Sequence, residues 1–129
     1  MTGDVLVDTN AIIAFVSGDP LIARRVSSAE SIQLSFVVLG ELSFGVERST
    51  RRIENQLRIE RIRQACVFLP CDAETAIEYG RVKNRLRAAG RPIPEGDIWL
   101  AAQSFRHGVP VLSRDRHFSF VEGLRWETC

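Results

Sequence analysis

The chain has 129 residues, of which 45% are hydrophobic and 26% charged, and its formal net charge at pH 7 is +1. This length suits one domain, residues 1–129, and no apolar run approaches the roughly 18 residues that a membrane-spanning helix requires. A charge so close to zero does not by itself indicate a nucleic-acid-binding protein. Of the 17 basic residues only Lys83 is a lysine, and arginine binds phosphate through two prongs, but a genome rich in arginine codons would explain this bias equally well.

The cellular compartment is inferred from the N-terminus and the cysteines. The first residues show no basic region followed by an apolar stretch and a cleavage site, so no secretory signal is recognised. The chain has an odd number of cysteines, and no two of them form a Cys-x-x-Cys pair: they are Cys66, Cys71 and Cys129. We therefore expect inert thiols and a cytoplasmic protein.

In the first half of the chain, short apolar runs alternate with helical patterns. The pattern predicts strands at 5–7 and 32–35 and helices at 11–16, 21–29, 36–47 and 48–64. Asp8 or Thr9 is expected to cap the first helix. In the charged helix 48–64, we expect Ile53, Leu57 and Ile62 to form the inward-facing stripe.

The second half continues the alternation. It predicts a strand at 67–69, a helix from the cap Asp72 to about residue 89, a helix at 95–106, a strand at 111–112 and a further edge strand at 124–126. Such alternation is typical of an α/β fold with a mainly parallel sheet. Ligands of these sheets bind outside the carboxyl ends of the strands, and this is where we look for a site.

Four acidic residues have positions of interest. Asp8 and Asp115 follow predicted strands, and Asp97 lies in the first turn of a helix. Glu41 is the one acid of a nearly uncharged helical segment, so we expect it to be at least partly buried and to need a hydrogen bond or a cation.

Each acid also has a purely structural explanation. Asp8 and Asp97 could be helix caps, Asp115 a turn residue, and Glu41 the partner of an arginine. Carboxylates gathered at one sheet edge repel one another, however, by about 4 kcal/mol per close pair at an intermediate effective dielectric. A hard divalent cation such as Mg²⁺ would offset this repulsion and could activate water against a phosphate.

These residues resemble the PIN domain, specifically its VapC-like toxin ribonucleases. The resemblance spans nearly the whole chain and rests on four segments in the right order: VLVDTN at 5–10, VLGELSFGVE at 38–47, GDIWLAA at 96–102 and VLSRDRHF at 111–118. None is specific alone, but their order and separations together are.

The resemblance implies a three-layer α/β/α sandwich and an endoribonuclease that depends on Mg²⁺ or Mn²⁺. It also implies the toxin of a toxin–antitoxin pair, with RNA as substrate and a homodimer as the expected assembly. The catalytic metal ligands would be Asp8, Glu41, Asp97 and Asp115. Nearby polar groups would position water or phosphate: Thr9, Asn10 and Ser113. The antitoxin would lie across the charged helix and could insert a charged residue into the acidic site.

One position departs from the family pattern. Many relatives have asparagine directly before the third acid, where this chain has Gly96. A polar group is then missing there, or Glu95 substitutes for it.

Other residues leave two explanations open. Arg114, Arg116 and His117 flank Asp115 and could contact RNA phosphates, or they could be ordinary surface charge. The arginines and glutamates of the charged helix are typical of a solvated face with internal ion pairs. Trp99 fits core packing or a homodimer contact better than base stacking.

Two alternative functions remain at this point. One is a PIN-domain RNA-processing nuclease outside any toxin–antitoxin pair. The other, from a different class, is a receiver-like module switched by phosphorylation. Asp72 could imitate its acceptor, but Lys83 lies mid-helix rather than near the last strand.

Overall fold

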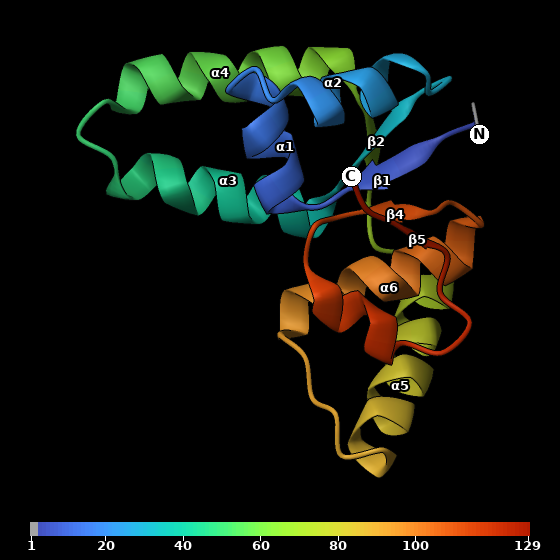
Figure 1. Ribbon diagram of the computed structural model, residues 1–129. Helices are drawn as coiled ribbons and strands as arrows, with labels where there is room; N and C mark the ends of the chain where they lie inside the picture. Colours follow the sequence, from blue (N-terminus) through green and yellow to red (C-terminus); the bar gives the residue numbers. More distant parts are fainter. Residues whose placement is uncertain (1–2) are drawn as a thin grey trace.

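The computed structural model describes residues 3–129 and contains a five-stranded sheet in the order β3-β2-β1-β4-β5 (Figure 1). Each pair of neighbouring strands is parallel. The strands are β1 (Val5–Val7), β2 (Ile32–Ser35), β3 (Val67–Leu69), β4 (Val111–Leu112) and β5 (Trp126–Glu127). The predicted α/β class is confirmed, and the expected edge strand is β5, shifted by two residues from its predicted start.

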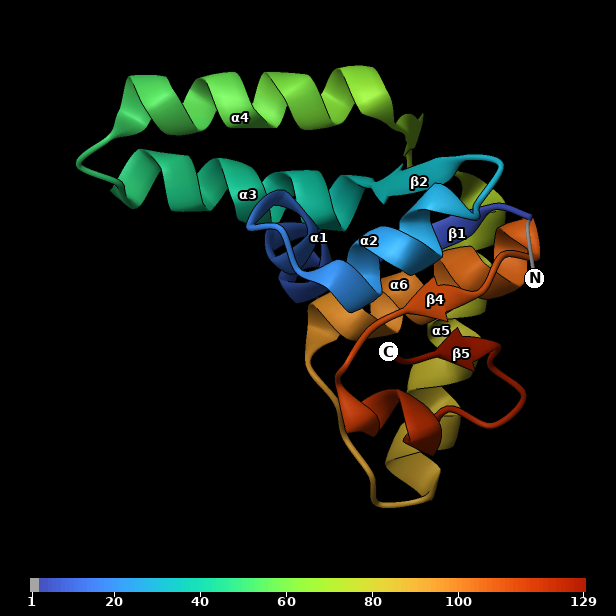
Figure 2. The ribbon, with the colours of Figure 1, turned by 45° about the horizontal axis from the view of Figure 1, so that its top comes forward.

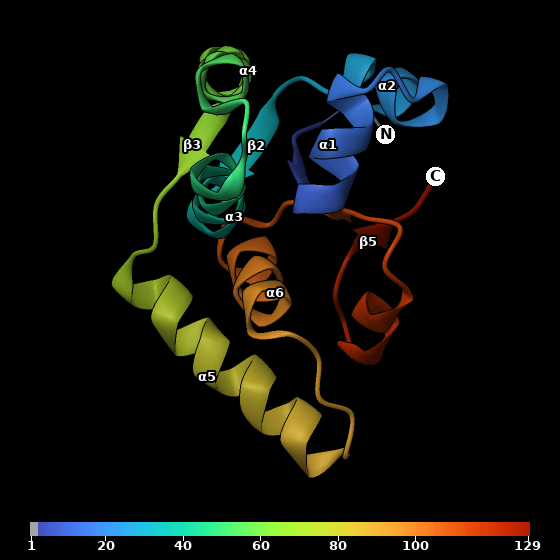
Figure 3. The same cartoon turned by 90° about the vertical axis from the view of Figure 1, so that its left-hand side faces the viewer.

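Helices cover both faces of this sheet. They are α1 (Thr9–Val16), α2 (Pro20–Ser27), α3 (Phe36–Arg48), α4 (Arg52–Ala65), α5 (Ala73–Ala88) and α6 (Glu95–His107), with a 3₁₀ turn, η1, at Arg116–Phe120. Helices α1, α2 and α4 lie on one side, and α5, α6 and η1 on the other (Figure 3). Helices α3 and α4 form a long hairpin that extends beyond the sheet (Figures 1 and 2).

The core follows from this layering. Val5, Leu6 and Val7 of β1 are at most 1% exposed, because a central parallel strand is covered on both faces and therefore reads as a continuous apolar run. A second cluster joins α5 to α6 through Val82, Leu86 and Ile98.

Helix α1 is capped by Asp8 rather than Thr9, since the Asp8 side chain accepts a hydrogen bond from the backbone of Ala11. Asp72 caps α5, as predicted, through the backbone of Thr75. Both caps satisfy a backbone N–H that has no partner within its helix.

The predicted inward stripe of the charged helix is wrong in two of its three residues. The segment is broken before α4 begins at Arg52, and Ile53 and Leu57 are 81% and 55% exposed. Ile59 is buried instead and Ile62 packs against the core. The predicted and the observed inward residues both fit helical spacing. Only the docking of α4 against α3 and β3 therefore decides which of them are buried.

Among residues 3–129, no helix combines the length and the apolar character needed to cross a membrane.

Candidate active site

A cavity of about 230 Å³ lies at the carboxyl ends of β1 and β4. Its lining includes all four predicted acids, which come from four separate segments. Asp8 directly follows β1, Asp115 lies beyond β4, Glu41 is on α3, and Asp97 is in the first turn of α6. The remaining lining residues are Thr9, Asn10, Pro94 and Gly96. The parallel sheet thus gathers these carboxylates at one edge.

Asp8 is both a helix cap and a wall of the cavity. Its side chain is buried, with Oδ1 accepting from the Ala11 backbone at 2.8 Å and Oδ2 accepting from the Ser113 hydroxyl. Burial raises the pKa of Asp8 above its ordinary value, and the nearby Asp115 carboxylate adds to this rise, although the two hydrogen bonds oppose it. Asp8 therefore caps α1 and lines the cavity at the same time, so its structural explanation does not exclude a role in the site.

Asp97 faces a histidine across the cavity edge. Nε2 of His117 lies 2.6 Å from Oδ2 of Asp97, and Nδ1 of His117 lies 3.9 Å from Oδ1 of Asp115. Burial raises the pKa of Asp97, and the charges of Asp8 and Asp115 raise it further against the opposing effect of His117. Asp97 does not cap α6, whose N-terminal boundary residue is Pro94.

His117 was not among the predicted ligands or catalytic residues. Asp97, Asp115 and His117 each offer a ligand atom, and these atoms lie within 4.8 Å of one another. The signal in the sequence was the spacing Asp-x-His directly after a strand at the active edge. From the sequence alone, His117 has two explanations, a contact with RNA phosphate or ordinary surface charge, and neither of them is metal binding.

Glu41 is exposed, so the expectation of partial burial is wrong. Its segment is apolar because the other side of α3 packs on the core, whereas Glu41 faces the open cavity. The Thr9 hydroxyl donates a 3.1 Å hydrogen bond to its Oε2, and no arginine pairs with it among the described residues.

Ser113 holds acids rather than a free water or phosphate. It is fully buried, and its hydroxyl donates to Asp8 while accepting from the Asp115 backbone N–H at 2.9 Å. The predicted role of Ser113 in positioning substrate therefore needs correction, because its hydroxyl already links two acids. Asn10 is exposed at the cavity wall, where its amide remains accessible.

Arg114 does not point toward the cavity. Its guanidinium donates two hydrogen bonds of 2.8 Å to Asp19 and a third, of 3.0 Å, to the Cys129 carbonyl. These hydrogen bonds favour a structural role for Arg114, and its contact with RNA phosphate stays a prediction. Arg116 is exposed on η1, next to Asp115 in sequence, and stays a candidate.

Glu95, the possible substitute for the asparagine that is missing at residue 96, is not among the residues that line the cavity. Glu95 binds Lys83 at 2.6 Å and accepts a hydrogen bond from the Tyr79 hydroxyl.

The Tyr79 ring stacks on Trp99 at 4.0 Å between centroids, and Phe36 meets Trp99 edge-on at 5.7 Å. Trp99 is therefore a packing residue, as one of its two explanations predicts.

The donor set fits a hard divalent cation. Carboxylate oxygens are the ligands that Mg²⁺ and Mn²⁺ prefer, and an imidazole nitrogen is compatible with Mn²⁺. Burial raises the pKa of both Asp8 and Asp97, and a neighbouring carboxylate adds to the rise in each, so a bound cation would favour their charged forms. Asp97, Asp115 and His117 are close enough to share one ion, with Asp8 and Glu41 on the same cavity wall.

Comparisons with known proteins agree with this picture. The family model described as "PIN domain" matches residues 5–124. "Ribonuclease VapC2" of Haemophilus influenzae is 30% identical over 125 residues, covering 95% of each chain, and "tRNA(fMet)-specific endonuclease VapC" of Shigella flexneri is 29% identical with the same coverage. The solved structure of VapBC-1 from nontypeable Haemophilus influenzae superposes with a TM-score of 0.88 at 26% identity, covering 97% of each chain.

Proposed function

The chain belongs to the PIN-domain family and, within it, to the VapC ribonuclease toxins, and we propose that it is an endoribonuclease that requires Mg²⁺ or Mn²⁺. The observation that carries the proposal is the convergence of Asp8, Glu41, Asp97 and Asp115 on one cavity, joined by His117. Membership in the VapC family favours a toxin over an RNA-processing nuclease. The receiver alternative is unsupported, because Lys83 is engaged by Glu95.

In the proposed reaction, water attacks the phosphorus in line, the bond to the 3′-oxygen breaks, and that oxygen takes up a proton. A bound divalent cation would supply positive charge against the charge that builds up on the phosphate. Asp97 and Asp115 would hold it together with Asp8.

The chain's other groups orient these acids. Ser113 fixes the carboxylate of Asp8 and the backbone of Asp115, and His117 fixes Asp97 through Nε2. Glu41 is exposed to the cavity and held by Thr9, which suits it to accept the proton of the attacking water.

The test is cleavage of defined RNAs, with initiator tRNA among them because the Shigella flexneri relative carries that substrate in its name. We expect cleavage with Mn²⁺ or Mg²⁺ and none with chelator. Asp8→Asn should also abolish it, while α1 stays capped because asparagine caps a helix as well as aspartate does. Cleavage that continues in chelator would reject the metal requirement.

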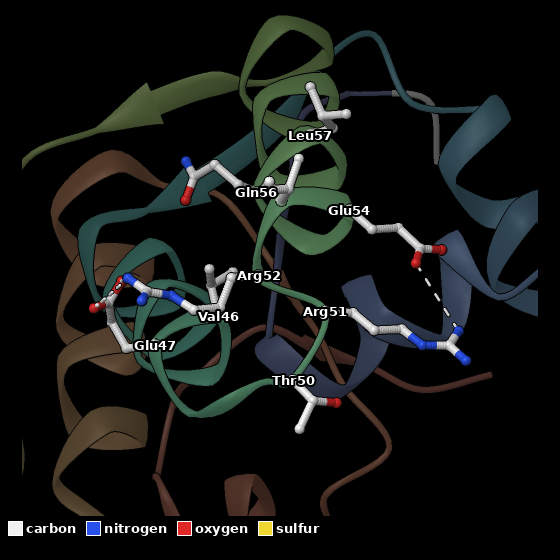
Figure 4. A pocket seen from close by; sticks show the side chains of 9 residues that line it. Val46, Glu47, Thr50, Arg51, Arg52, Glu54, Gln56 and Leu57 are labelled. Carbon is white, nitrogen blue, oxygen red and sulfur yellow. Dashed lines mark hydrogen bonds and ion pairs between the residues drawn. The ribbon is translucent and has the colours of Figure 1, made fainter.

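We further propose that an antitoxin restrains the enzyme by binding the α3–α4 hairpin. A groove of about 280 Å³ between α1, α3 and α4 is flanked by exposed Ile13 and Val16. A second hollow of about 750 Å³ lies at the hairpin tip, with Leu57 among its lining residues (Figure 4). Ile53 also lines it, and both side chains are exposed. Exposed apolar side chains gathered beside two hollows of one hairpin, with polar residues around them, are typical of a protein–protein interaction site.

The occupant we propose is an amphipathic segment of the antitoxin. Its apolar face would fill the groove, and acidic side chains would meet the arginines of α4. Arginines at the start of α4 already pair with glutamates: Arg52 with Glu47 of α3, and Arg51, just before the helix, with Glu54 (Figure 4). Solved neighbours of this fold include toxin–antitoxin complexes such as VapBC-1.

The test uses the product of a small gene adjacent to this one, which we expect to encode the antitoxin. Ile53→Glu and Leu57→Glu should each weaken its inhibition by about 10-fold or more, as for anchor residues of an interface, and leave cleavage by the free enzyme unchanged. Unaltered inhibition in both variants would place the antitoxin elsewhere. The homodimer, the cytoplasmic location and the single nuclease domain spanning residues 1–129 stay predictions.

A further inference from the structure

Helices α3 and α6 approach each other directly beside the carboxylate cavity. Gly96, in the first turn of α6, lines the cavity together with Glu41 of α3. It immediately precedes Asp97, so its position sets how near the two carboxylates can lie.

A side chain at residue 96 would collide with Glu41. A Cβ atom built there would lie 2.9 Å from Oε1 of Glu41 and 3.2 Å from Cγ1 of Val37. The backbone does not require glycine, because Gly96 is not among the glycines with positive φ. Alanine would ordinarily be the better residue in a helix. The missing side chain therefore serves the approach of Glu41 and not the conformation of the chain.

From this contact we infer that Gly96 is a positioning residue, whose missing side chain admits the Glu41 carboxylate to the cavity beside Asp97. The inference rests on the proposed function. Of the two groups that a side chain would meet, the Glu41 carboxylate is the end of a flexible side chain, whereas Val37 is a short β-branched residue of α3. Glu41 is therefore the group that must move.

A displaced Glu41 would also lose the hydrogen bond that holds its carboxylate. Its Oε2 accepts the 3.1 Å hydrogen bond from Thr9, and a shift of the carboxylate breaks or lengthens this bond. The asparagine that many relatives have at this position begins with the same Cβ. With the placement of α3 and α6 in this chain, that Cβ would require the Glu41 carboxylate to shift.

The experiment is a double-mutant cycle on Gly96→Ala and Glu41→Ala. Mn²⁺ affinity is measured by calorimetry, and thermal unfolding is measured in chelator. Gly96→Ala should weaken Mn²⁺ binding by about 10-fold, comparable to the loss of an outer partner of a metal ligand. In the Glu41→Ala background the same change should alter affinity by less than about twofold, because the colliding carboxylate is gone.

The metal-free melting temperature gives an independent readout. The stabilisation that Gly96→Ala brings to the helix should be smaller when Glu41 is present than when residue 41 is alanine, because only the Glu41 carboxylate must be displaced. Gly80→Ala in α5 is the matched control, since a Cβ there meets nothing within 4 Å and the substitution should stabilise the helix. If Gly96→Ala alone fails to fold, recovery of folding in the double variant supports the inference.

Two results would overturn the inference. One is Mn²⁺ affinity in Gly96→Ala equal to that of the native protein. The other is an additive loss in the double variant. A native protein that binds no Mn²⁺ is a different outcome: it rejects the proposed function, whereas the unfolding cycle still decides whether Gly96 and Glu41 are coupled.

Discussion

At the starts of α2 and α5, Asp19 and Asp72 lie against arginines, whereas at the starts of α1 and α6, Asp8 and Asp97 lie near other carboxylates. Arg114 holds the pKa of Asp19 at about 2, and the Thr75 hydrogen bonds and Arg106 hold that of Asp72 well below its usual range. Burial raises the pKa of both Asp8 and Asp97.

The difference separates acids that are paired within the fold from acids of the candidate site. An aspartate at a helix start is stabilised by the backbone and by an arginine supplied from elsewhere in the fold. Where the fold places further carboxylates beside the aspartate instead of an arginine, a bound cation would have to neutralise the negative charge. Perturbed carboxyl groups that share a cavity mark such a site.

The largest expected effect is on RNA cleavage. Asp97→Asn should lower the rate by more than about 100-fold, beyond the range for outer partners of a metal ligand, because it removes a charged ligand. Asp72→Asn changes the same residue type at the start of the neighbouring helix and should leave the rate unchanged. Initial rates on one labelled RNA with Mn²⁺ measure both. Equal cleavage rates in Asp97→Asn and Asp72→Asn would contradict the distinction between these two acids.

The next effect is on stability with metal. Mn²⁺ at 100 times its dissociation constant should raise the free energy of unfolding by about 2.7 kcal/mol in the native protein. Asp97→Asn should lose most of this increment, while Asp19→Asn should retain it, since Asp19 is already neutralised by Arg114. Urea titrations with and without Mn²⁺ provide the measurement. The idea fails if Asp19→Asn loses the increment instead.

The smallest effect is on how stability depends on pH in chelator. The folded protein binds a proton at Asp97 more tightly than the unfolded chain does, so Asp97 stabilises the fold at acid pH, and this contribution is lost as the pH rises through the raised pKa. Asp97→Asn should therefore melt above the native protein at pH 7, and the gap should narrow toward pH 3.

The pKa of Asp19 shifts in the opposite direction on folding, so its contribution to stability has the opposite pH dependence. Its pKa falls from 3.8 to about 2 on folding, so its contribution is present above 3.8 and is lost as the pH falls through about 2. Asp19→Asn should melt below the native protein at pH 7 and merge with it near pH 2. Melting curves of the three proteins from pH 2 to 8 are sufficient, and parallel curves would contradict both assignments.

Sequence patterns were reliable where one element carries its own signal. The run Val5–Val7 predicted a buried strand and Asp72 a helix cap, because both depend on neighbours in the chain. They were unreliable where the partner lies far away. Nothing local distinguishes Arg114, which binds Asp19, from an arginine that faces RNA.

The sequence by itself determined the α/β order, because strands and helices follow from local periodicity. It also singled out the four acids that line one cavity in the structure. Only the tertiary structure decided that Glu41 is exposed, that His117 joins Asp97, and that Gly96 leaves room for Glu41. These facts depend on how α3, α6 and η1 pack beside the sheet, and the distances between side chains on separate elements are fixed by packing and not by spacing along the chain.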